Sequence, residues 1–206
     1  MRHIHHFLLL VALLTSPVAF GQITEDPEER REQGQTPLKS QTPTGEPLPL
    51  KDRLRFGGGI SALSFSPFSI GISPVVAYQV SEHFVAGVGV GYTYTKYGAQ
   101  YYGAAVTSNQ YSGRVFGMYE LIPAILPNLY AHAEIGQGSY SIKVDGRGAA
   151  QTGSATATLL GATYSQPIGR LFSANLSVLY NLNYVNDLTN QQLYGGSPVV
   201  LRILFF

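Results

Sequence analysis

The sequence predicts an all-β fold, an eight-stranded antiparallel up-and-down transmembrane β-barrel over residues 54–206. Three observations predict it. Apolar and polar residues alternate along several segments, the polar positions of these segments carry almost no charge, and aromatic residues gather at the segment ends. Because successive side chains of a strand point to opposite faces, each segment forms a ribbon with one apolar and one polar face.

The segment at residues 172–184 shows the alternation most clearly. One face is apolar or aromatic throughout, with Phe172, Ala174, Leu176, Val178, Tyr180, Leu182 and Tyr184. The other face carries serine and asparagine, with Leu179 as its apolar exception. That polar face has no charged residue, although the water-exposed side of a soluble sheet normally has several. We therefore expect lipid on the apolar face and a narrow polar lumen on the other.

The remaining strands follow from the same pattern. The eight expected strands cover residues 54–65, 69–80, 84–97, 111–120, 129–141, 154–166, 172–184 and 197–206. Eight is an even number, as bacterial barrels require. Pro74 cannot donate to a ladder, so a bulge or a skipped bond is expected in the second strand. Leu159-Leu160 predicts a bulge in the sixth strand, and the facing of the last strand is left open because nearly all its residues are apolar.

Connections between the strands mostly alternate in length. Short turns are expected at residues 81–83 and 167–169, and longer polar loops at residues 98–110, 143–153 and 186–196. With the N-terminus in the periplasm, the turns face the periplasm and the loops face outside, as in outer-membrane barrels. Aromatic residues recur eight to ten positions apart. That spacing is about 20–25 Å along the membrane normal, close to the separation of the two aromatic girdles of such barrels.

Two segments precede the barrel. Residues 1–21 are expected to be a signal peptide, with Arg2 near the start, an apolar core at residues 7–14 and small residues before Gln22. Residues 22–53 hold 12 charged residues and five prolines. Such a stretch buries too little apolar surface to offset the entropy of ordering, so we expect a disordered periplasmic lead-in.

The composition excludes several classes of protein. Residues 55–206 hold 12 charged residues in 152 positions, far below the quarter or so found in soluble domains. A net charge of +1 argues against nucleic acid as a partner. The chain has no cysteine, which excludes disulfides and thiol catalysis, and we expect no cofactor and no metal. A secreted lipocalin-like barrel remains the alternative, although its outside would carry Lys and Glu.

Five charged or titratable residues fall on the lumen side of the expected strands: Arg55, Arg114, Glu120, His132 and Glu134. An eight-stranded lumen has room for side chains only, and an unpaired buried charge is costly. If the fourth and fifth strands pair around a turn near residues 124–126, Arg114 lies diagonal to Glu134. We expect a salt-bridge network that plugs the barrel, with a gated ion path and catalysis as the alternatives.

Tyrosine and amide side chains decorate the expected outer loops. The candidate surface contacts are Tyr101, Tyr102, Gln191 and Tyr194. These residue types make adaptable contacts, and loops on a rigid scaffold commonly carry binding. The loops are therefore candidates for binding an extracellular ligand, and the alternative is that they are simply solvated.

Several short pieces of the barrel resemble a known family. Phe56-Gly57-Gly58, Ile72-Ser73-Pro74, Leu160-Gly161 and the runs at residues 164–169 and 179–183 are similar to segments of the small outer-membrane β-barrel proteins of Bacteroidota. More loosely, the architecture resembles OmpA/OmpX-type eight-stranded barrels. These resemblances imply a cell outer-membrane location. They also imply Omp85-type machinery that reads the C-terminal strand, with Phe206 as the expected C-terminal assembly signal.

The expected function is that of an integral protein in outer-membrane lipid, an envelope scaffold or surface-contact protein with a plugged lumen. The first alternative is a small-solute channel, and the second is a lipid-modifying outer-membrane enzyme. We do not expect an enzyme. A lipid hydrolase needs serine and histidine at the bilayer-facing rim, whereas His132 faces inward and no His-x-Ser pair occurs.

Overall fold

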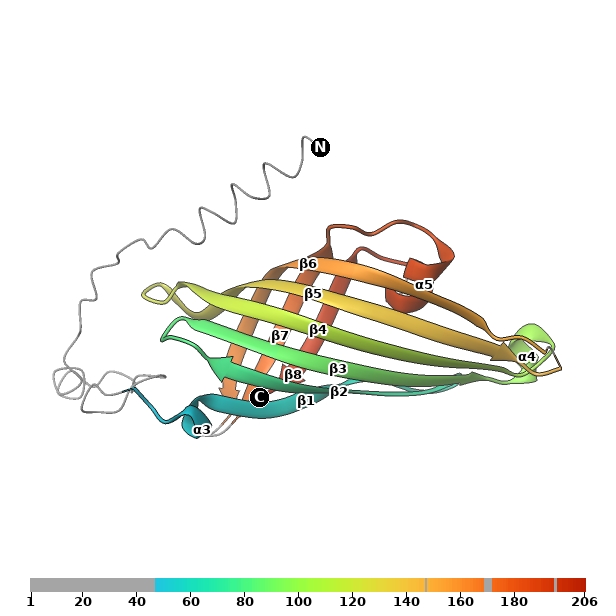
Figure 1. The fold of residues 1–206 in the computed structure, drawn as a ribbon, viewed down its shortest axis with the longest axis horizontal. Helices are drawn as coiled ribbons and strands as arrows, with labels where there is room; N and C mark the ends of the chain where they lie inside the picture. Colours follow the sequence, from blue (N-terminus) through green and yellow to red (C-terminus); the bar gives the residue numbers. More distant parts are fainter. Residues whose placement is uncertain (1–46, 147, 169–171, 195) are drawn as a thin grey trace.

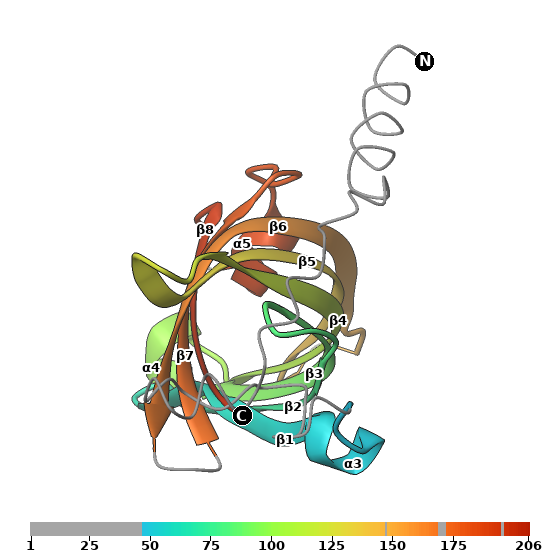
Figure 2. The ribbon, with the colours of Figure 1, turned by 90° about the vertical axis from the view of Figure 1, so that its left-hand side faces the viewer.

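The structure, a computed structural model, describes residues 47–146, 148–168, 172–194 and 196–206. Its eight strands close an antiparallel barrel in which each strand pairs with its neighbours in the chain and β1 pairs with β8 (Figures 1 and 2). This confirms the predicted all-β, eight-stranded antiparallel fold. The expected signal peptide and the lead-in up to residue 46 lie outside the described residues.

The strands are β1 (Leu54–Phe65), β2 (Phe68–Gln79), β3 (Phe84–Tyr97), β4 (Val106–Ile122), β5 (Leu126–Val144), β6 (Gln151–Ile168), β7 (Phe172–Asn181) and β8 (Val199–Phe205). The described helices are short: α3 (Leu50–Arg53), α4 (Ala99–Tyr102) and α5 (Leu188–Tyr194). Within the described ranges, no helix combines the length and the apolar character needed to cross a membrane.

Strand lengths differ from those that the alternation predicts. β4, β5 and β6 are longer because their backbones keep pairing after the apolar pattern has ended, as far as the pair Val106↔Val144. β7 is shorter and ends at Asn181. Beyond Asn181, the side chain of Asn183 takes the place of the backbone hydrogen bonds to β6. Its Oδ1 accepts a hydrogen bond from Thr158 N at 2.7 Å, and its Nδ2 donates one to Thr156 O at 2.6 Å.

The end of the predicted disordered lead-in is ordered. Residues 50–53 form α3, and the Arg53 guanidinium donates to the carbonyl oxygens of Gln79 at 2.9 Å and Val80 at 2.5 Å. The same group lies 5.0 Å from the ring centre of Tyr78. The expectation of disorder is therefore wrong for this turn, because one arginine ties it to the end of β2.

The barrel has two unlike ends. The start of β1, the end of β8 and the connections after β2, β4 and β6 lie at one end, here named the turn end. The connections after β1, β3, β5 and β7 lie at the other, the loop end, which carries α4 and α5. There the long strands β3 to β6 extend past β7 and β8 into a tip that holds α4 (Figure 1).

The strand registers test the two predicted irregularities. The β2–β3 ladder jumps from Ile72↔Tyr92 to Val75↔Gly89 without a change of register, so Pro74 interrupts the bonds and makes no bulge. The bulge predicted at Leu159-Leu160 is wrong, because β6 keeps one register with both β5 and β7. The apolar run has another cause: Leu159 points into the lumen, where it packs in an apolar cluster with Ala157 and Leu179.

The outer face of the barrel is apolar. Its exposed side chains include Ile60, Ile72, Val88, Val90, Val115, Ile135, Leu160, Leu176, Val178, Leu201 and Ile203. Among the described outward-facing strand residues, charge is confined to Lys96 and Lys143 near the loop end. β8, whose facing the sequence left open, follows the same pattern, since Leu201 is 71% exposed whereas Leu204 is 3% exposed.

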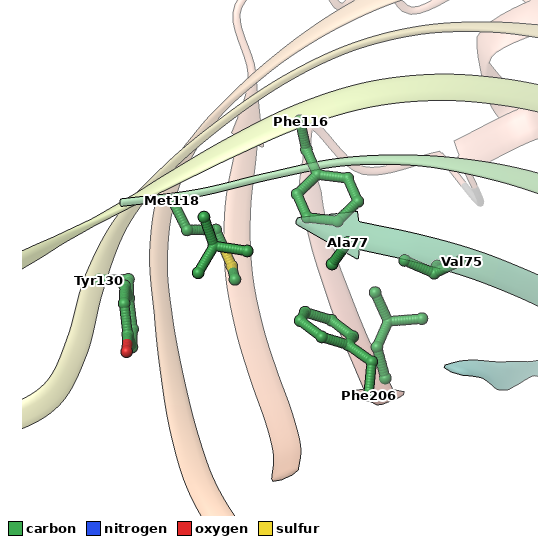
Figure 3. Packing of buried hydrophobic residues seen from close by; sticks show 8 residues of the cluster. Val75, Ala77, Phe116, Met118, Tyr130 and Phe206 are labelled. Carbon is green, nitrogen blue, oxygen red and sulfur yellow. The ribbon is translucent and has the colours of Figure 1, made fainter. Parts of the chain in front are cut away.

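Apolar side chains fill the lumen at the turn end. This turn-end cluster consists of Val75, Ala77, Val85, Phe116, Met118, Tyr130, Leu204 and Phe206. Its members come from five strands and the chain end and meet across the lumen, where the rings of Phe116 and Phe206 lie 6.1 Å apart (Figure 3). The lumen is therefore not uniformly polar, as the alternation had predicted, since its turn end holds this apolar cluster beside buried polar side chains such as Gln79, Glu120 and Asn175.

The barrel closes along a short seam between β1 and β8. The described pairing there is Gly58↔Phe205. A Cβ atom at the neighbouring Gly57 would lie 1.8 Å from the carbonyl oxygen of Phe205 and 2.6 Å from Cβ of Phe206. Since a backbone atom cannot move aside as a flexible side chain can, the seam requires glycine at position 57.

We predict that Gly57→Val lowers the free energy of unfolding by about 3 kcal/mol, the upper part of the range for overpacked sites. The added side chain would push β8 away from β1 and open the seam. Denaturant unfolding of the protein in detergent, followed by circular dichroism, measures the change. Gly113→Val is the matched control, because a Cβ atom there meets nothing within 4 Å. Equal stability of the two variants would show that the seam between β1 and β8 can accommodate a side chain at position 57.

Candidate functional site

A carboxylate held by two arginines lies near the middle of the lumen. Glu134 of β5 is 4% exposed, and its Oε2 accepts a hydrogen bond from Nη1 of Arg202 on β8. The Nε of Arg114 on β4 lies 3.7 Å from the same oxygen. Because β5 and β8 are not neighbours in the barrel, this ion-pair cluster spans the lumen and joins strands that share no backbone hydrogen bonds.

The position of Arg114 follows from the register of β4 and β5. Arg114 pairs with Gly136, and Phe116 pairs with Glu134, so the arginine and the carboxylate are diagonal neighbours on the lumen face, as the sequence predicts. The guanidinium extends across β3, where a Cβ atom at Gly89 would lie 3.0 Å from it. Its Nη2 then donates to Ser73 Oγ on β2 at 2.8 Å.

The sequence reasoning missed Arg202. It lay in the one strand whose facing was left open, between Leu201 and Ile203. Side chains of a strand alternate between the two faces, so an arginine flanked by two outward apolar residues faces the lumen, and this signal was enough to find it.

A chain of buried polar groups leads away from Glu134. His132 Nε2 lies 3.7 Å from Glu134 Oε2, and His132 Nδ1 lies 2.7 Å from Thr163 Oγ1. Thr163 Oγ1 is in turn 2.8 Å from Ser177 Oγ. All of these side chains are fully or almost fully buried. The chain connects β5, β6 and β7, so it stabilises the wall of the barrel beside the ion pairs.

Two of the five predicted lumen residues are not in this cluster. Glu120 is buried at the turn end, where its Oε2 lies 3.2 Å from His83 Nδ1 and its Oε1 accepts from the backbone N–H of Asn128 at 2.9 Å. Asn128 adopts a φ of 67°, at the register shift between β4 and β5. Arg55 is half-buried near the start of β1 and makes no ion pair or hydrogen bond with the described part of the chain.

A cavity of about 780 Å³ occupies the lumen on the loop-end side of the ion pairs. Its floor carries Arg114, Glu134 and Arg202. α5 narrows it from the loop end and lies within the outline of the barrel in the view along its axis (Figure 2). Leu193 of α5 sits over Gly138, at 3.2 Å from the place of a Cβ atom. The turn-end cluster lies below the floor, so this loop-end cavity is a dead end.

The loop that carries α5 is fastened at its start. The backbone N–H of Asn190 donates to Asp187 Oδ1 at 2.7 Å, the hydrogen bond of a helix N-cap. The hydrogen bonds from Asn190 lower the pKa of Asp187. Gln192 O accepts from Gln110 Nε2 of β4 at 3.0 Å. The bonds to Asp187 cap the helix, and the bond from Gln110 joins α5 to the barrel.

The predicted surface contacts fall in two places. Tyr101 and Tyr102 are exposed on α4, where both rings contact Tyr97 and the Tyr101 hydroxyl lies 2.8 Å from Ser66 Oγ. Gln191 is exposed on α5. Tyr194 differs, because it is half-buried and lines the loop-end cavity. Burial raises the pKa of Tyr194, and the nearby charge of Glu134 raises it further.

Within the described residues, no group of three His, Cys, Asp or Glu side chains is placed to hold a metal ion. No protein-family model, no curated protein and no solved structure matches the chain. The site is therefore interpreted from its own geometry.

We predict that Glu134→Gln lowers the free energy of unfolding by about 3–5 kcal/mol, the usual cost of removing one partner of a buried ion pair. The loss of the carboxylate charge leaves the buried Arg114 and the half-buried Arg202 near each other without the charge that both pair with. Denaturant unfolding in detergent measures the change. Asp145→Asn, a charge removal at an exposed position, is the control and is expected to change little. A neutral result for Glu134→Gln would mean that the arginines find other partners.

Proposed function

We propose that this protein is an integral outer-membrane β-barrel that acts as an envelope scaffold or surface-contact protein and has a lumen closed to passage. The observation that supports this proposal is where the apolar and the charged side chains of the barrel lie. Apolar side chains cover the outside of the barrel, whereas the ion pairs lie inside it, with buried hydroxyl groups and two apolar clusters. A soluble barrel would carry charged side chains on its outer face, where this barrel is apolar.

The outer face supports a lipid surrounding. Soluble monomers rarely expose a contiguous apolar patch larger than a few hundred Å². Here exposed valine, leucine and isoleucine side chains occur on all eight strands. Lys96 and Lys143, the outward charges of the described strands, pair with the same residue of β4, Thr107, near the loop end. That position suits the water-facing margin of a bilayer.

Aromatic pairs mark two levels on the outer face. Phe84 pairs with Tyr119 towards the turn end, and Tyr92 pairs with Tyr111 eight residues further along β3. The rings of Tyr92 and Tyr111 lie 5.1 Å apart. Eight residues of tilted strand cover about 20 Å along the barrel axis, close to the height of the apolar band in outer-membrane barrels. These rows are therefore proposed as the two aromatic girdles.

The route to the membrane is also a proposal. The signal peptide expected at residues 1–21 would direct export. The family resemblance then supplies Omp85-type machinery as the assembly partner that reads the last strand. In the structure Phe205 faces outward, while Phe206 is buried in the turn-end cluster. A reader of that strand would thus meet Phe205 on the lipid side.

A closed scaffold is favoured over a small-solute channel. The loop-end cavity would suit a channel mouth, but the turn-end cluster and the ion pairs lie beneath it. A lipid-modifying enzyme is not favoured either. The hydroxyl nearest His132 belongs to Thr163, which is fully buried in the barrel wall, away from any lipid rim.

For the surface-contact role we propose the tip where β3 to β6 end, which the turn between β1 and β2 joins through Ser66. α4 presents Tyr101 and Tyr102 there, beyond the ends of the shorter strands. Exposed tyrosines on a rigid extension are suited to adaptable contacts with an extracellular ligand.

The depth dependence of a charged substitution tests the lipid surrounding. We predict that Leu176→Arg, halfway between Phe172 and Tyr180 on β7, lowers the stability of the protein in lipid vesicles by about 2–4 kcal/mol, whereas Tyr180→Arg at the end of the band costs about 0–1 kcal/mol. Reversible unfolding in vesicles measures both. A soluble barrel would tolerate either change within about 0.5 kcal/mol, because both positions face outward.

Planar-bilayer conductance separates the scaffold from the channel. We predict no discrete openings for the native protein, because the turn-end cluster seals the lumen. Phe116→Ala combined with Met118→Ala removes two of its large side chains and is expected to produce openings. Native openings that disappear in Arg114→Ala would instead establish the channel.

A further inference from the structure

The loop-end cavity carries an excess of positive charge. Of the residues that line it, Arg114, Arg202 and Glu134 are charged, so two positive charges and one negative charge leave a net charge of +1. All three lie on the floor, and no other charged residue of the described chain lines the cavity. A cleft with walls of low dielectric concentrates the field of such a charge and attracts a counter-ion. The floor therefore favours a small anion.

The floor also offers hydrogen-bond donors to a ligand. Arg114 lines the cavity, and its Nη2 donates to Ser73 Oγ, while its Nε is fully buried beside Glu134 and is closed to a ligand. Arg202 is 19% exposed and bonds to described residues only through Nη1, which leaves further donors of a group that has five. These remaining guanidinium donors can bind an acceptor that enters the cavity.

The walls of the cavity differ in chemistry. Hydroxyl and amide groups of β1 to β4 line one side, with Ser61, Ser69, Thr93, Thr95, Gln110 and Ser112. The opposite side is apolar and is formed by Ala157, Leu159, Leu193 and Val200. A hydroxyl group both donates and accepts, so the polar wall can bind hydroxyl groups of a ligand even where its members bond to each other. The apolar wall suits a surface of C–H groups.

We propose that the loop-end cavity binds a small, singly charged sugar acid, a hexuronate, with its carboxylate on Arg114 and Arg202. The ring hydroxyls face the polar wall, and the C–H groups of the ring face the apolar wall. A volume of about 780 Å³ is ample for such a molecule. The turn-end cluster closes the floor, so the sugar acid enters and leaves at the loop end, past α5. The cavity is a property of the barrel itself, and the proposal does not depend on its surroundings.

Titration calorimetry of the full mature chain in detergent micelles tests the proposal with three probes. D-glucuronate is expected to bind at least tenfold more tightly than D-glucose, which lacks the charge, and than acetate, which lacks the ring. Equal affinity for glucose would overturn the role of the arginines. Equal affinity for acetate would overturn the sugar part, and no heat with glucuronate would overturn the whole proposal.

Variants locate the site. Arg202→Gln makes the floor neutral and is expected to weaken glucuronate binding at least tenfold, whereas Lys143→Gln removes the same charge from the outside and is expected to change nothing. Ser112→Trp fills the cavity from an exposed position without altering its charge, and is expected to abolish binding even if Arg202→Gln does not fold. Native affinity in either folded variant would overturn the proposal. Association of the protein with lipid vesicles, measured separately, tests the proposed membrane location and does not test the binding of glucuronate.

Discussion

The rest of the barrel depends on the ion pairs that the carboxylate of Glu134 makes across the lumen. A buried carboxylate is tolerated where opposite charges surround it, and here Arg114 and Arg202 approach it from two different strands. A shift of β5 by one residue would turn every side chain of that strand to the other face. Glu134 would then point outward and both arginines would lose their partner. The ion pairs thus select one register among the alternatives that a small barrel allows.

The same cluster divides the lumen into two parts of opposite character. On the turn-end side an apolar cluster with Phe116 and Phe206 in contact fills the lumen. On the loop-end side it is a cavity with polar and apolar walls. The ion pairs lie where the two meet, so their charges are shielded on one side and accessible on the other. This asymmetry favours a closed barrel that binds a ligand at its loop end over a barrel that lets solutes pass through.

Glycine has a structural role in this arrangement. Gly89 leaves space on β3 for the guanidinium of Arg114, which reaches Ser73 across it. Gly57 allows the backbones of β1 and β8 to meet at the seam. In both cases the absence of a side chain leaves room for another group, the charged guanidinium at Gly89 and the neighbouring strand at Gly57. Gly57 therefore serves the closure of the barrel, and Gly89 serves the packing of the lumen.

The sequence by itself determined the fold class, the number of strands and the faces of β2, β3 and β7, because alternation is a local property of a strand. It also placed Arg114 diagonal to Glu134, since a turn between consecutive strands sets their register. It did not find Arg202, which lies far along the chain in an almost uniformly apolar strand. It also did not find the turn-end cluster, because an inward valine or phenylalanine interrupts the alternation of apolar and polar residues just as a bulge would. The positions of α5 and Tyr194 inside the lumen were also decided by tertiary structure. Closure of the barrel brings β5 opposite β8, and contacts between non-neighbouring strands have no signature in local periodicity.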